Sequence, residues 1–249
     1  MKKVFVAIPT FKGKNYCAND FFNNLYMLKI LNPNWHFFIA DNSDCPFFQE
    51  QVKELGFCYI WDEEGSKLKY GREKIVHSRN LLREKFLESK YELFLSLESD
   101  HFPTNQLIKK MFATIEENNF KVLGSFYWVS KTKPCAYLLV DKELGYYNND
   151  IDNDHRIRVR LPLPEEILAF NVENVVTGGL GCCLIAREVL EKISFRIKDP
   201  AVFQSSDDNY FGVDLRKFGY DYWLDFKNIC EHHYLTDGTI TGHSQDLFF

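Results

Sequence analysis

The first 120 residues alternate short apolar runs with segments in which apolar residues recur at helical spacing. Val4–Ile8, His36–Ala40 and Leu93–Leu97 are short runs closed by polar or turn-forming residues, and we expect them to be buried strands. Asn15–Leu31 and Gly71–Ser89 carry apolar side chains three or four residues apart, which predicts helices. This alternation predicts an α/β fold with a mostly parallel central sheet and helices on both faces.

The second half of the chain is less regular. The segment Val175–Ile185 is apolar, and its glycines allow the backbone to approach a ligand or to bend sharply. Residues 141–166 are polar and predict an insertion or mobile loop. We also expect strands at Val122–Val129, Ala136–Val140 and Tyr222–Phe226, and helices that begin at Thr104 and Asp207.

Composition narrows the class of protein. A chain of 249 residues with 45% hydrophobic content can build one large core or two small ones. The net charge of -5 argues against nucleic acid as a partner and leaves room for a local basic pocket that takes a small anion. No apolar run approaches the length of a membrane span or a signal sequence. The seven cysteines contain no CxxC pair, so we expect no disulfide framework and a cytoplasmic location.

Acidic pairs supply the candidate chemistry. Glu98 and Asp100 follow the buried run 93–97, where two carboxylates repel each other unless a cation or solvent compensates them. They therefore predict a site for Mg²⁺ or Mn²⁺, with a solvated turn or a helix cap as the alternative. Asp207 and Asp208 begin a helix, as either a catalytic base or a cap. His232 and the residue after it would point to opposite faces of a strand, so at most one faces a metal.

Taken in chain order, these residues resemble the GT-A fold glycosyltransferases that use nucleotide-diphosphate sugars. The resemblance runs through residues 3–233 and is carried by Ile8-Pro9-Thr10 (first strand and nucleotide-binding turn), Asp41-Asn42-Ser43 (acidic end of the second strand), His77-Ser78-Arg79-Asn80 (a helix with Arg-Asn), Glu98-Ser99-Asp100 (the DxD metal motif), Val176-Thr177-Gly178-Gly179 (the acceptor-side strand), Asp207-Asp208 (the Glu-Asp pair) and His232 or His233 (a histidine metal ligand). Glu98 and Asp207 each depart from the family's residue, which makes Asp100 the safer metal ligand.

The resemblance implies a GT-A type fold, with a smaller acceptor-side sheet beside the central one. It implies a catalytic domain over residues 1–233, divided into a nucleotide-sugar half (1–120) and an acceptor half (121–233), and a tail over 234–249. The implied reaction moves a sugar from a UDP- or GDP-sugar to a hydroxyl acceptor, a glycan, with Mn²⁺ or Mg²⁺ stabilising the departing diphosphate.

The resemblance also assigns roles to individual residues. It makes Asp100, Glu98 and His232 the metal ligands and Asp208, backed by Asp207, the base of an inverting transfer. The nucleotide, diphosphate or sugar would be contacted by Pro9, Thr10, Asp41, Arg79, Glu98, Ser99, Gly178 and Gly179.

Several of these assignments have structural alternatives. Asp41 could only close a turn, Arg79 could pair with a buried carboxylate, and Gly178-Gly179 could form a bulge. Two other functions also remain open. One is a sugar nucleotidyltransferase, although the turn after the first strand lacks the glycine-rich, basic loop typical of that class. The other is a non-catalytic module that binds nucleotide sugars or glycans.

Overall fold

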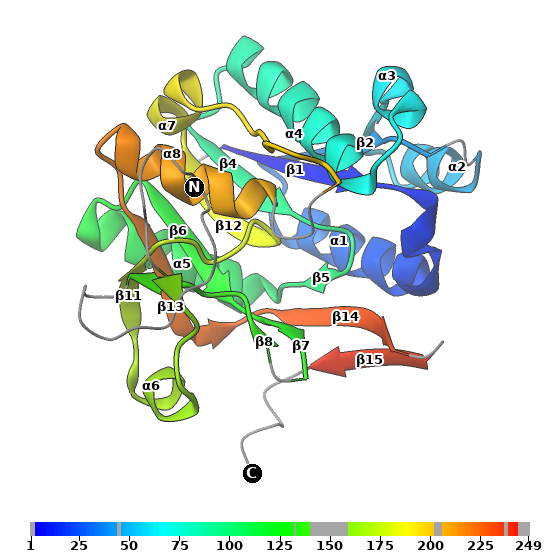
Figure 1. Ribbon diagram of the computed structural model, residues 1–249. Coiled ribbons are helices and arrows are strands. Elements are labelled where there is room, and N and C mark those ends of the chain that lie inside the picture. Colours follow the sequence, from blue (N-terminus) through cyan, green and yellow to red (C-terminus); the bar gives the residue numbers. More distant parts are fainter. Residues whose placement is uncertain are drawn as a thin grey trace.

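An eight-stranded sheet forms the centre of the protein (Figure 1). The computed structural model describes residues 3–43, 46–131, 133–139, 159–201, 206–236 and 239–243. In their order across the sheet, the strands are β11 (Val172–Val175), β13 (Tyr222–Ile229), β6 (Val122–Phe126), β12 (Cys182–Ala186), β4 (Leu93–Leu97), β1 (Val4–Thr10), β2 (Trp35–Asp41) and β3 (Cys58–Trp61).

The strand directions follow the expected parallel pattern with two exceptions, β12 inside the sheet and β11 at its edge. β1 pairs in parallel with β2 and β4, β2 with β3, and β6 with β13. β12 runs antiparallel to both of its neighbours, β4 and β6, and the edge strand β11 is antiparallel to β13. The predicted mostly parallel α/β sheet is therefore confirmed, with β12 as an antiparallel strand inside it.

Helices cover both faces of this sheet, as the alternation predicts (Figure 1). They are α1 (Ala18–Leu31), α2 (Pro46–Glu54), α3 (Glu63–Lys67), α4 (Gly71–Glu88), α5 (Asn105–Asn118), α6 (Pro164–Ala169), α7 (Arg187–Lys192) and α8 (Asp207–Lys217). The Arg83 guanidinium of α4 donates to carbonyls of α7 and its end, which joins these helices on one face. Asn32, at the end of α1, donates to Asn105 of α5 at 2.8 Å on the other face. No helix in the described ranges is long and apolar enough to cross a membrane.

Local sequence explains where several elements begin and end. The Thr104 hydroxyl accepts a hydrogen bond from the Leu107 amide at 3.1 Å and caps α5 as expected. Arg79 is buried on the inner side of α4, as its phase in the helix predicts. The helix expected from residue 15 is wrong at its start, because residues Lys12–Cys17 form a 3-10 helix (η1) and α1 begins at Ala18.

Smaller sheets pack beside the large one. β5 (His101–Phe102), β14 (Glu231–Thr236) and β15 (Thr239–His243) form a three-stranded sheet, and β14 crosses the boundary expected at residue 233. Two hairpin-like pairs join β7 (Trp128–Ser130) to β8 (Lys133–Pro134) and β9 (Leu138–Leu139) to β10 (Val159–Arg160).

Two of the predicted strands and the predicted insertion differ in extent from these elements. The strand predicted over 122–129 is divided between β6 and β7, and the described part of the strand predicted over 136–140 is reduced to β9. Of the expected insertion over 141–166, residues 141–158 lie outside the described residues, while 159–166 contain β10 and the start of α6.

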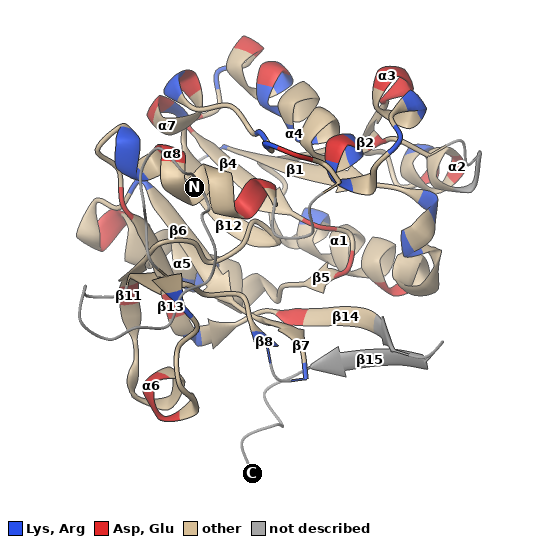
Figure 2. Ribbon diagram, viewed as in Figure 1, with Lys and Arg blue, Asp and Glu red and all other residues tan. Residues whose placement is uncertain are grey.

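Charge is mixed along the described surface helices. Acidic and basic residues both occur on each of the helices α3, α4 and α7 (Figure 2). Positive charge that attracts an anion therefore comes from the basic side chains that line individual cavities.

Candidate functional site

The candidate residues converge at the carboxyl-terminal edge of β1, β2 and β4. Because β1 and β2 pair in parallel, Thr10 lies opposite Asp41. The Thr10 hydroxyl donates a hydrogen bond to the Ser99 hydroxyl at 3.0 Å and so ties the end of β1 to the acidic loop after β4. The Glu98 amide donates to the Gly181 carbonyl at 2.9 Å, and Gly181 precedes the antiparallel strand β12. The antiparallel strand therefore contributes its leading loop to the same edge.

Arg79 holds three of the candidate carboxylates. Only 1% of its side chain is exposed, and one terminal nitrogen contacts Glu98. The other lies 2.5 Å from Asp207 Oδ2 and 3.6 Å from Asp208 Oδ1. Burial favours the neutral guanidine, but the carboxylates outweigh this effect and raise the pKa of Arg79. Arg79 thus pairs with buried carboxylates, which was the alternative considered from the sequence. A contact between Arg79 and the diphosphate stays a prediction.

The two aspartates that begin α8 have different environments. The Asp207 side chain is 8% exposed and pairs with Arg79, whereas the Asp208 side chain is 30% exposed and lines a cavity. Burial and the neighbouring Asp207 charge raise the pKa of Asp208 to about 7, with Arg79 opposing the rise. A carboxylate with a pKa near neutrality is a more effective proton acceptor than an ordinary one. Burial raises the pKa of Asp207 too, so exposure to the cavity is what distinguishes Asp208 as the candidate base.

Asp100, His101 and His232 form a compact group of potential metal ligands. Each offers one ligand atom, and these atoms lie within 4.8 Å of one another. Asp100 Oδ1 is 3.0 Å from His101 Nδ1, and Asp100 Oδ2 is 3.2 Å from His232 Nε2. The two imidazole rings stack with their centroids 4.4 Å apart. His101 stands in this group where the resemblance placed Glu98, whose carboxylate instead contacts Arg79.

The hydrogen bonds around His232 suit a metal ligand. His232 Nδ1 lies 2.8 Å from the Trp128 carbonyl, which can only accept, so Nδ1 carries a proton. Nε2 then faces Asp100; burial lowers the pKa of His232, but the bond to Asp100 and its charge raise it on balance. A cation bound at Asp100 could take the place of that second proton. His101 Nε2 is buried without a hydrogen-bond partner in the described part of the chain. One carboxylate and two imidazoles favour Mn²⁺ over Mg²⁺.

The neighbouring histidine points elsewhere. His233 Nε2 lies 2.7 Å from Glu231 Oε1, and its ring packs 4.1 Å from that of Phe102. Side chains alternate along β14, so His232 and His233 face opposite sides. Of the two histidines considered from sequence, the structure places His232 at Asp100.

Asp41 closes the turn after β2. It is fully buried and accepts hydrogen bonds from the amide and hydroxyl of Ser43 and from the Tyr59 hydroxyl at 3.2 Å. Burial raises the pKa of Asp41, although these hydrogen bonds oppose the rise. Asn42 lines a cavity beside it and donates to the Ser78 hydroxyl at 3.0 Å. Asp41 therefore makes the hydrogen bonds of a turn, which was the alternative considered from the sequence. A contact between Asp41 and a nucleotide stays a prediction.

Gly178 and Gly179 allow aromatic side chains to pack closely. Gly179 has a φ of +79°, and a Cβ there would lie 2.0 Å from the Tyr127 hydroxyl oxygen. A Cβ on Gly178 would lie 2.7 Å from atoms of both Tyr222 and Leu224. The tandem glycines are therefore required for packing, and a contact with substrate stays a prediction.

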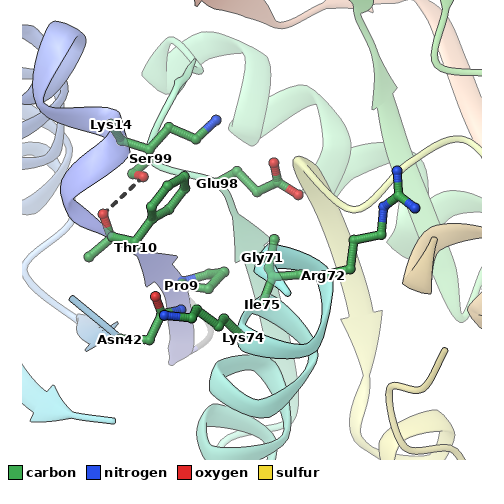
Figure 3. A pocket seen from close by; sticks show the side chains of 11 residues that line it. Pro9, Thr10, Lys14, Asn42, Gly71, Arg72, Lys74, Ile75, Glu98 and Ser99 are labelled. Atoms are coloured by element: carbon green, nitrogen blue, oxygen red, sulfur yellow. Dashed lines mark hydrogen bonds between the residues drawn. The ribbon is translucent and has the colours of Figure 1, made fainter. Parts of the chain in front are cut away.

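Two cavities meet at these residues. The first, of about 270 Å³, is lined by Pro9, Thr10, Phe11, Lys14, Asn42, Gly71, Arg72, Lys74, Ile75, Glu98 and Ser99 (Figure 3). The second, of about 430 Å³, is lined by Phe11, Gly13, Lys14, Tyr16, Glu98, Asp100, His101, Tyr127, Val129, Asp208, His232 and Tyr234. We call them the phosphate cavity, after its three basic side chains, and the metal cavity. Phe11, Lys14 and Glu98 line both.

Four charged or potentially metal-ligating residues of these cavities were not identified from the sequence. Lys14 follows the first strand closely, and Arg72 and Lys74 lie in the first turn of α4. Basic residues just after the first strand and at the start of this helix could have indicated an anion-binding cavity from the sequence. His101 directly follows the acidic motif. Adjacency alone did not reveal that its ring turns inward against Asp100.

Comparisons with known proteins identify the fold. No family model and no curated protein matches the sequence. Among solved structures, S. aureus TarS 1-349 superposes with a TM-score of 0.56 at 13% identity, over 92% of this chain and 59% of TarS 1-349. The mannosyltransferase PcManGT from Pyrobaculum calidifontis, in complex with GDP-Man and Mn²⁺, gives 0.56 at 14% identity, over 92% of this chain and 56% of that one.

A third structure is of another enzyme class. CMP:2-keto-3-deoxy-manno-octonic acid synthetase complexed with CTP gives a TM-score of 0.50 at 13% identity, over 90% of this chain and 89% of the synthetase. This chain thus spans between one half and two thirds of TarS 1-349 and of the mannosyltransferase, and most of the synthetase. Identities this low establish the fold alone. The chain has a GT-A-like fold, which it shares with TarS, the mannosyltransferase and the synthetase.

Proposed function

We propose that this protein transfers a sugar from a nucleoside-diphosphate sugar to a hydroxyl group of an acceptor, with a divalent cation bound. One observation carries the proposal: the candidate metal ligands Asp100, His101 and His232 and the candidate base Asp208 line the same cavity, which adjoins a cavity with basic side chains. Glycosyl transfer to a hydroxyl needs these three elements close together.

The phosphate cavity is suited to the nucleotide diphosphate. Lys14, Arg72 and Lys74 provide positive charge, while Thr10 and Asn42 provide polar groups at the ends of β1 and β2. Ligands of open α/β sheets bind at this carboxyl-terminal edge. GDP-Man is bound in PcManGT and UDP-GlcNAc in TarS, which supports a UDP- or GDP-sugar as donor here.

Asp100, His101 and His232 would hold the cation, Mn²⁺ or Mg²⁺, and Glu98 borders both cavities beside them. When bound, the cation would supply positive charge for the diphosphate as the bond to the sugar breaks. Mn²⁺ is present in the PcManGT complex, which supports the same choice for a site with two imidazoles.

Asp208 would accept the proton of the acceptor hydroxyl at its carboxylate. Arg79 fixes Asp207 and Glu98 on either side, which holds the start of α8 against the acidic loop. A base that removes this proton lets the hydroxyl attack the sugar from the side opposite the diphosphate, so we assign inversion of configuration to the proposed reaction. The glycan acceptor is carried over from the sequence resemblance.

A thermal-shift panel tests the donor and the cation together. Wild-type protein with UDP-, GDP- or CMP-sugars should melt higher in the presence of Mn²⁺ than without it. Asp100→Asn should lose this Mn²⁺-dependent stabilisation and reduce transfer by about a hundredfold or more. The variant should stay folded but melt below the wild type, because its buried ion pair with Lys14 is broken, so the comparison is made within the variant, with and without Mn²⁺. Asp221→Asn, at an exposed position, is the matched control. Full activity in Asp100→Asn would remove the metal assignment.

A sugar nucleotidyltransferase is the second candidate. The synthetase complexed with CTP supports it, because the superposition covers nearly all of both chains. The two reactions release different products. Pyrophosphate released from a nucleoside triphosphate would favour the nucleotidyltransferase, whereas nucleoside diphosphate released from a nucleotide sugar would favour the glycosyltransferase.

A further inference from the structure

The Lys14 ammonium pairs with Asp100, the carboxylate that we propose as a metal ligand. The residue lies in η1, just after β1, and its ammonium forms an ion pair with Asp100 Oδ2. The same oxygen is 3.2 Å from His232 Nε2. The Asp100 side chain is only 3% exposed, while that of Lys14 is 22% exposed and borders solvent. The oxygen of Asp100 that would bind a metal together with His232 therefore has an ammonium as its partner.

We propose that Lys14 is an exchangeable counter-ion: its ammonium holds Asp100 until a divalent cation displaces it, and it then pairs with the phosphates of the donor. This inference rests on the proposed function, since it requires a metal at Asp100 and a diphosphate in the phosphate cavity.

Electrostatics requires the exchange. A divalent cation binds a carboxylate oxygen at about 2.0–2.2 Å, and an ammonium on the same oxygen would lie within a few ångströms of it, where like charges repel strongly. The Asp100 carboxylate is buried, contacts the His101 and His232 rings at 3.0 and 3.2 Å, and forms the ion pair with Lys14. Asp100 is thus a charged ligand that is already compensated, and a metal must replace part of that compensation.

The position of Lys14 provides a destination for the displaced ammonium. Its side chain lines both cavities, and Figure 3 shows it along one edge of the phosphate cavity, on the side of Glu98. The four-carbon stem of lysine is flexible, so the ammonium can move without a change in the backbone. Lys74, by contrast, donates to the Ser66 carbonyl at 2.9 Å, a bond that a metal at Asp100 would not disturb.

The exchange couples two ligands. Without a phosphate ligand, a metal that displaces Lys14 breaks the ion pair between Lys14 and Asp100, and the ammonium gains no new partner. This loss weakens metal binding. A bound diphosphate would accept the displaced ammonium and lower that cost. Metal and nucleotide should therefore strengthen each other's binding beyond their direct contact, and by the same factor in both directions.

Mn²⁺ binding without nucleotide tests the inference directly, by calorimetry or by the spin-resonance signal of free Mn²⁺. Lys14→Met removes the ammonium but keeps an apolar stem of similar length. Lys12→Met, an exposed lysine of the same 3-10 helix that lines neither cavity, removes the same charge and is the control. We expect Lys14→Met to bind Mn²⁺ about tenfold more tightly than wild type, and Lys12→Met less than about twofold. Lys14→Gln should follow Lys14→Met.

The outcomes separate this inference from the proposed function when Asp100→Asn is measured in parallel. Equal or weaker Mn²⁺ binding in Lys14→Met than in Lys12→Met, with binding lost in Asp100→Asn, would overturn the counter-ion and leave the metal centre standing. No Mn²⁺ binding by any of these proteins, with or without UDP or GDP, would overturn both. In a supporting result, added UDP or GDP tightens Mn²⁺ binding more in wild type than in Lys14→Met.

Discussion

Replacing Asp208 by asparagine should stabilise the protein while it abolishes transfer. Burial and Asp207 raise the pKa of Asp208 from an ordinary value of 3.8 to about 7, so the ionised form is disfavoured in the folded state. At 1.36 kcal/mol per pH unit, this corresponds to at most about 4 kcal/mol. The side chain is 30% exposed and solvent screens part of the repulsion, so we expect a gain of about 1–2 kcal/mol and about 3–6 °C in melting temperature.

The pH dependence identifies the cause. Between about pH 4 and pH 7, folded wild-type protein keeps a proton on Asp208 that the unfolded chain has released, so its stability falls as the pH rises through this window. Asp208→Asn lacks this titration. The difference in unfolding free energy should therefore be near zero at about pH 4, grow through the window and stay constant above about pH 7.

Thermal unfolding of both proteins from pH 4 to pH 8 measures this difference, with Asp221→Asn as a control for the loss of one exposed carboxylate. Transfer by Asp208→Asn should fall by about a hundredfold or more, because the base is lost. If Asp208→Asn melts below wild type at pH 8, or the gap is the same at pH 4.5 and pH 8, the carboxylate is not strained by its neighbours and the reasoning fails.

Three further substitutions test contacts that stabilise the fold and the candidate site. Arg79→Met leaves a cluster of buried carboxylates without their cation and should lower the free energy of unfolding by about 3–5 kcal/mol, measured by urea denaturation. Gly179→Ala should cost about 1–3 kcal/mol because its Cβ would meet the Tyr127 hydroxyl; adding Tyr127→Phe should recover part of the loss in the same assay, and no recovery would contradict the contact. Thr104→Ala should cost about 1 kcal/mol, because the Leu107 amide loses its cap, and an unchanged urea midpoint would count against that role.

Local pattern predicted the elements whose signals lie within a few residues. The apolar run 93–97 is strand β4, the stripe in 71–89 is helix α4, and the inward phase of Arg79 is confirmed by its burial. Side-chain alternation also separated His232 from the histidine that follows it. These inferences needed only periodicity and capping chemistry.

Long-range pairing was beyond the sequence pattern. Arg79 meets Asp207, 128 positions away, and no local feature distinguishes this partner from a phosphate. His101 fits against Asp100 because Gly181 leaves room: a Cβ there would lie 2.2 Å from His101 Nε2. Strand direction is equally non-local, so the antiparallel course of β12 could not be inferred from its apolar residues.

The place of β12 also constrains how the protein is made. β4 and β6 are synthesised early, yet they never pair with each other, because β12 lies between them and bonds to both. A nascent chain that ends before residue 182 therefore has an open edge on β4, the kind of edge to which other chains can add. Translation must therefore proceed past the glycine-bearing loop before β4 and β6 can be joined into one sheet through β12.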